Sequence, residues 1–228
     1  MSGTEQGAAP PEADGAAATA TPPSTATPPS AVRKLKSPAS LALADLAALF
    51  EDLQTSLKCC ERLVSELATP EPDELTLEAY WTTAVLSYAR CFAPGPRGIG
   101  LTEADIAETK LAGDVAGWHR TLLSLRDRYA DPAVNPRESF SVGAAQDASG
   151  HAEGIAVASS RQPQLDEVSV RQTGAVAFAL SRLVDERLAA QQGVVFTAVA
   201  AMARPALDKL PLLQLARQGS VADEGPPD

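Results

Sequence analysis

The chain has 228 residues and a formal net charge of −10, with 29 acidic side chains against 19 from Lys and Arg. An acidic surface repels the nucleic-acid backbone at long range, which disfavours RNA as a partner. No apolar run approaches the roughly 20 residues of a transmembrane helix. The N-terminus lacks the basic start and apolar block of a secretory signal. We therefore expect no contact with a membrane.

Both ends of the chain are predicted to be disordered. Residues 1–37 are rich in Pro, Ala and Thr and contain almost no large apolar side chain, and residues 219–228 have a similar composition. Such segments cannot bury enough apolar surface to offset the conformational entropy of the chain. The remaining residues, 38–218, are long enough for one domain with a hydrophobic core.

The cysteines and histidines do not indicate a metal site. Cys59 and Cys60 are adjacent, Cys91 makes the total odd, and no spacing suits zinc. His119 and His151 have no Cys, Asp or Glu nearby at ligand spacing. We therefore expect no metal, no cofactor and a reduced, cytoplasmic protein.

The first predicted helix begins near Ser37 and Pro38, because proline suits an early helical position, and it ends near residue 68. Its apolar residues recur at spacings of three and four, which is typical of a helix with one buried stripe. The stripe either packs inside the chain's own bundle or pairs with a second copy. Leu49 and Leu63 widen it, which favours the bundle. The stripe consists of Leu43, Leu46, Phe50, Leu53, Leu57, Cys60, Val64 and Leu67.

Three further helices are expected at about 76–92, 114–129 and 172–203, the last with a break or bend at Gly193. Thr102 and Asp105 have the spacing of a capping box, which predicts a helix start between the first two of these. The predicted inward positions are Leu77, Tyr80, Trp81, Ala84, Val85, Tyr88 and Phe92, then Val115, Trp118, Leu122, Leu125 and Tyr129, then Val176, Leu180, Leu183, Val184 and Leu188.

After Pro136 the pattern alternates as in strands, at 140–144, 155–157 and 168–170, with a turn signal at 147–150. We expect a small hairpin or a three-stranded appendage near 138–171. The fold class is therefore mainly α: a bundle of four to five helices with a small β-hairpin insertion and disordered termini.

Two segments, 80–92 and 119–135, resemble HEPN-type proteins, a family of helical nucleotide-binding proteins and ribonucleases. The first has a tryptophan-containing helix with a Tyr-x-Arg element, and the second has a helix that ends in Leu-Arg-Asp and a loop that ends in Val-Asn. The matching residues are Tyr88, Arg90, Leu125, Arg126, Asp127, Arg128, Tyr129, Val134 and Asn135.

The resemblance implies a ribonuclease site in which Arg126 steadies the phosphate and a histidine shortly after it moves the proton of the 2′-hydroxyl, with two copies meeting across a dimer interface. Here Asp131, Pro132 and Ala133 occupy the histidine positions. We therefore expect the ordinary activity to be absent or badly weakened. Asp131 could act as a base only with a raised pKa, and His119 could supply the imidazole from the same helix.

Each candidate also has a structural interpretation. His119 could be partly buried against a carboxylate or carbonyl, Arg126 could pair with an acid on another helix, and Asp127 could orient the loop. The catalytic candidates are Arg126, His119 and Asp131, and the binding candidates are Arg126, Asp127, Arg128, Asn135, Tyr88 and Arg90.

Two functions remain open from the sequence. The first is a non-catalytic HEPN-like module that acts by dimerisation or by binding a protein partner. The second, implied by the resemblance, is a metal-independent ribonuclease-like effector of the toxin or phage-defence type with a non-standard site.

Overall fold

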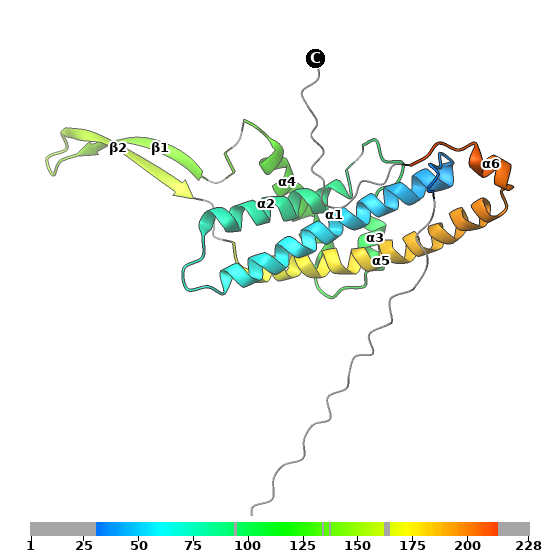
Figure 1. The fold of residues 1–228 in the computed structure, drawn as a ribbon. Coiled ribbons are helices and arrows are strands. Elements are labelled where there is room, and N and C mark those ends of the chain that lie inside the picture. Colours follow the sequence, from blue (N-terminus) through cyan, green and yellow to red (C-terminus); the bar gives the residue numbers. More distant parts are fainter. Residues whose placement is uncertain (1–30, 94, 134, 137, 162–164, 214–228) are drawn as a thin grey trace, which may run out of the picture.

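The computed structural model describes residues 31–93, 95–133, 135–136, 138–161 and 165–213. Within these residues the chain forms four long helices, two short helices and one two-stranded antiparallel hairpin (Figure 1). The prediction of a mainly helical fold with a hairpin insertion is confirmed. No helix of the described part is long and apolar enough to cross a membrane.

The longest helices form the centre of the bundle. Helix α1 (Pro38–Leu67) runs alongside both α2 (Glu74–Arg90) and α5 (Glu167–Ala200). Helices α1 and α5 approach closely at Gly174, where a Cβ atom would lie 3.3 Å from the Cβ of Cys60. A glycine at this crossing therefore lets the two backbones come together.

The centre of the apolar stripe of α1 is buried inside the chain's own bundle, and its other residues are partly buried. Leu49, Leu53 and Leu63 have no exposed surface, and Leu46 and Cys60 are at most 5% exposed. This confirms packing within the bundle, and the buried part of the stripe is therefore covered without a second copy. One inward position of α2 was predicted wrongly: Tyr80 is 37% exposed, whereas the adjacent Trp81 is buried.

Helix α4 (Val115–Ala130) packs against α2, and the short α3 (Glu103–Glu108) lies between the two in the chain. The predicted capping box is present, because the Thr102 backbone N–H donates to Asp105 Oδ2 at 2.6 Å. Helix α4 buries Val115, His119 and Leu122. The His119 side chain is 2% exposed and points into the core.

The insertion is a hairpin of β1 (Glu138–Gln146) and β2 (Ala152–Arg161), with the expected turn at 147–150 and Gly150 at φ +90°. The prediction of strand at 168–170 is wrong because Asp166 caps a helix there, its side chain accepting the Ser169 backbone N–H at 2.8 Å. Helix α5 also continues without a break through Gly193.

The two ends of the described chain meet beside α6 (Arg204–Asp208). Lys34 donates its backbone N–H to Pro211, and Leu213 donates to Val32, which forms a short bridge between residues 33 and 212. Residues 32–34 therefore make backbone contacts although they belong to the segment that was expected to be disordered. The rest of the predicted tails, 1–30 and 219–228, and the end of the predicted domain at 218 lie outside the described residues.

Candidate functional site

The two segments that carry the family resemblance lie side by side on α2 and α4, and a buried polar pair joins them. The Tyr88 hydroxyl lies 2.9 Å from His119 Nδ1, and the two residues are 0% and 2% exposed. The ring of Phe92 covers the imidazole at a centroid distance of 4.4 Å. The partner of His119 is therefore a phenol, not the carboxylate or carbonyl that we expected.

Burial keeps both members of this pair uncharged. Burial lowers the pKa of His119, Glu103 opposes this shift, and Arg120 adds to it. Burial also raises the pKa of the Tyr88 phenol. A neutral imidazole enclosed between two helices stabilises their contact. Neither Tyr88 nor His119 can reach an external ligand unless α2 and α4 separate.

Two other candidate residues do come together at the surface. Arg90 of α2 and Arg126 of α4 line one hollow of about 340 Å³, together with Ser87. Arg90 Nη2 donates to Ser87 Oγ at 2.9 Å and lies 3.3 Å from Asp52 Oδ1. The hollow is thus lined by two arginines, whose guanidinium groups suit an anion, and that of Arg90 already pairs with the carboxylate of Asp52.

Arg126 pairs with its immediate neighbour in the chain. Its Nε and Nη2 atoms lie 2.8 and 2.7 Å from Asp127 Oδ1, and the Arg126 side chain is 31% exposed. Arg126 therefore pairs with an acid of its own helix, whereas an acid of another helix was expected. The Asp127 carbonyl accepts the backbone N–H of Asp131, so Asp127 supports the end of α4 through its main chain.

The remaining candidates lie apart from this hollow. Arg128 lines a separate, open groove between α4 and the start of α5, together with Arg120 and Gln172. Asp131 ends α4, and its side chain accepts the Ala133 backbone N–H at 2.8 Å. Asn135 is exposed beyond the helix, and Val134 lies outside the described residues.

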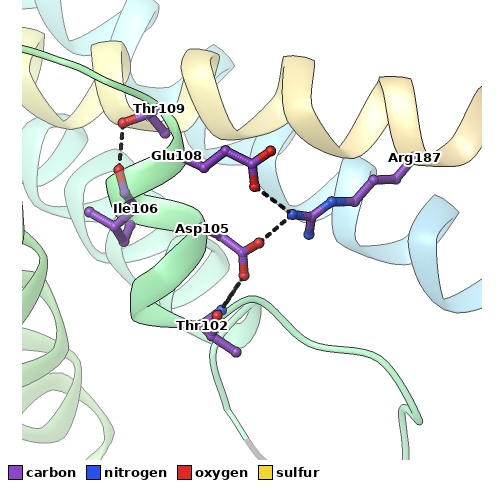
Figure 2. A network of polar contacts seen from close by, with 6 residues as sticks. All are labelled: Thr102, Asp105, Ile106, Glu108, Thr109 and Arg187. Carbon is purple, nitrogen blue, oxygen red and sulfur yellow. Dashed lines mark hydrogen bonds and ion pairs between the residues drawn. The ribbon is translucent and has the colours of Figure 1, made fainter.

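A charged network that the sequence did not predict joins α3 to α5 (Figure 2). Arg187 Nη2 lies 2.5 Å from Asp105 Oδ1 and 3.0 Å from Glu108 Oε2. Burial alone would raise the pKa of Asp105, but hydrogen bonds from Thr102 and Arg187 together hold it below its usual value. The two acids could have been paired from the sequence, because Asp105 and Glu108 are three residues apart and share one face of a helix. Nothing in the sequence indicated that Arg187, 82 residues after Asp105, would lie beside them.

The hairpin presents a second surface of interest, because its register places all of its large apolar side chains on one face. Val142 pairs with Val157 at the centre. These two residues, together with Phe140 and Ile155, are 60–73% exposed. We call this surface the hairpin apolar face. The alternation at 140–144 and 155–157 predicted its strands, but not that helices would leave it uncovered.

The described residues contain no group of three or more His, Cys, Asp and Glu side chains that could hold a metal ion. Comparisons of the chain with protein-family models, with curated proteins and with solved structures found no match. The candidate site is therefore defined by the residues and geometry of this chain alone.

Proposed function

We propose that this chain is a non-catalytic protein-association module whose docking element is the β-hairpin. The hairpin apolar face is the observation that carries this proposal. A two-stranded hairpin is marginally stable on its own in water, and an exposed apolar patch of this kind marks an interaction site. Because none of the described helices covers it, a docked protein would both cover and stabilise it.

The contacts within the helical bundle support a structural role for the helices and a docking role for the hairpin. The centre of its longest apolar stripe, on α1, is buried by contacts with α2 and α5. The HEPN-like segments are in turn tied together by the buried pair of Tyr88 and His119. We infer that the helices are a HEPN-like scaffold that holds the hairpin out, and that the protein is cytoplasmic. Its three cysteines are buried thiols, which accords with a reducing compartment.

Site-specific photo-crosslinking in the native cells tests the proposal. A crosslinking amino acid at Val142, on the hairpin apolar face, is expected to form an adduct of defined mass. The same amino acid at Ser141, which points to the opposite face, is the matched control and is expected to form none. The absence of an adduct at Val142, or equal labelling at both positions, would contradict docking through this face.

A second candidate function is a ribonuclease-like effector, and the hollow that contains Arg90 and Arg126 favours it. Two guanidinium groups from different helices could hold a phosphate. The enclosed position of His119 weighs against it as the base. RNA cleavage by the purified full chain that is lost in Arg126→Ala but retained in Arg171→Ala would support this function. If no such cleavage is found, the ribonuclease function is rejected and protein association remains the proposed function.

A further inference from the structure

We propose that the occupant of the hairpin apolar face is the same face of a second copy of this chain, packed across a two-fold axis that lies between the two hairpins. The inference deepens the proposed function and depends on it. The arrangement of large and small side chains on the face favours a second copy of this chain over a different protein.

The register of the two strands places the large side chains of the apolar face along a diagonal. Val142 and Val157 form the central pair. On one side of it, Phe140 lies opposite the small Ser159, and on the other side Ile155 lies opposite the small Ala144. The large residues therefore occupy opposite corners of the face, and the small residues occupy the other two. The pattern forms a ridge with a shallow recess at each side.

Such a face is complementary to itself. When a second hairpin is turned over about an axis parallel to the strands, its β1 lies above β2 of the first. Phe140 of each copy then lies over Ser159 of the other, and Ile155 lies over Ala144. An in-plane axis perpendicular to the strands also brings each large side chain over a small one. Layers interdigitate when large and small residues face one another in this way, and two-fold contacts require this self-complementarity.

The opposite face of the hairpin has no comparable feature. It consists only of Ser, Ala and Gly residues, which bury little apolar surface when they are covered. These residues are Ser139, Ser141, Gly143, Ala145, Gly154, Ala156, Ala158 and Ser160. Only one face of the hairpin therefore drives association, which limits the assembly to a pair and does not build a stack.

The area predicts how strong the pair is. Four large side chains exposed to this extent present roughly 400 Å² of apolar surface, similar to the largest patch of a typical monomer. Two facing patches bury roughly 800 Å² in total, below the range of about 1,200–2,000 Å² found in stable interfaces. The pair is therefore a weak dimer whose population depends on protein concentration.

The position of the hairpin allows this contact, because β1 and β2 project away from the helices (Figure 1). Every described side chain of β2 is exposed. A second hairpin can thus reach the apolar face without displacing a described helix.

Sedimentation equilibrium of the full chain over a wide concentration range tests the inference. Wild type is expected to form a concentration-dependent dimer. Ile155→Lys should raise its dissociation constant at least about tenfold, because two lysines enter an apolar contact. The matched variant Ala156→Lys places the same charge on the opposite face and should change the constant less than about twofold. The melting temperature of each variant checks that the bundle remains folded.

A third variant separates this geometry from general hydrophobic association. Ala144→Phe adds apolar surface, so non-specific association would become tighter. In the proposed pair the new ring meets a large side chain of the second copy, and the dimer should weaken at least about tenfold. Tighter association in Ala144→Phe would overturn the inference.

The failure of this inference can be told from the failure of the proposed function. A wild-type chain that stays monomeric at every concentration overturns self-association. If the Val142 crosslink then has the mass of a different protein, the docking role of the hairpin remains, and only the identity of its occupant changes.

Discussion

The helical bundle and the hairpin place their apolar residues in opposite ways. In the bundle, Leu49, Leu53 and Leu63 of α1 are fully buried by the chain itself. In the hairpin, Phe140 and Val142 are 60% and 71% exposed. The core of the bundle is closed, although α5 leaves Phe178, Val194 and Phe196 53–73% exposed. In the hairpin, every large apolar side chain is exposed. This difference in exposure distinguishes the apolar residues that stabilise the fold from those that are available to a partner.

The largest predicted effect compares one charge placed in both regions. Leu53→Glu should destabilise the bundle by more than about 4 kcal/mol, because it places a carboxylate in a fully buried position. Val157→Glu in the hairpin should change the unfolding free energy of the bundle by less than about 0.5 kcal/mol. Thermal unfolding followed by circular dichroism measures both. Similar losses in the two variants would show that the regions are not independent.

A smaller effect is expected where α3 is tied to α5. Arg187→Met keeps much of the apolar stem but leaves the carboxylate of Asp105, whose side chain is 9% exposed, without its guanidinium partner. We expect a loss of about 1–3 kcal/mol in urea unfolding. The control is Arg171→Met, which removes an exposed ion pair with Glu167 and should change stability by less than about 0.5 kcal/mol. Equal effects would contradict a stabilising role for the network.

The pH dependence of stability should depend on His119. Its folded-state pKa is lowered by burial, so below the unfolded-state value of about 6.5 the unfolded chain binds more protons than the folded chain. Stability should therefore fall as the pH decreases from 7 to 5. His119→Gln should flatten this slope. The control is His151→Gln, which replaces a histidine whose side chain is 84% exposed. Parallel slopes in all three proteins would contradict this account.

The smallest effect is expected from removing the hairpin. Replacing residues 138–161 by a short Gly-Ser linker should alter the unfolding free energy of the bundle by less than about 1 kcal/mol, because only a short loop is closed and few core contacts are lost. Chemical denaturation measures this change. A bundle that fails to fold without the hairpin would break the comparison between a closed scaffold and an exposed docking element.

The sequence predicts the helices well because their signals are local. The spacing of leucines defined α1, and Thr102 with Asp105 defined the start of α3. The error at 168–170 has a local cause as well, because two alternating valines look like a strand until the cap at Asp166 is recognised. Local sequence patterns therefore predict the helices and strands, except where a helix cap is not recognised.

The candidate site was harder to predict because its contacts join distant parts of the chain. Arg90 and Arg126 were both selected from the sequence, but their shared hollow depends on how α2 crosses α4. Burial of His119 was one of the interpretations from the sequence, but its partner was not: the Tyr88 hydroxyl of another helix takes the place of the expected carboxylate or carbonyl. The angle between helices, which no single segment encodes, decides such contacts.

Amide hydrogen exchange at several protein concentrations tests the central claim most directly. The account predicts that amides of 138–146 and 152–161 become more protected as the concentration rises, while those in the core of α1 and α5 stay equally protected. It also predicts that Ile155→Lys abolishes this concentration dependence and that Ala156→Lys preserves it. Protection of the hairpin that does not change with concentration, or that changes on the outer faces of the helices instead, would contradict association through the hairpin.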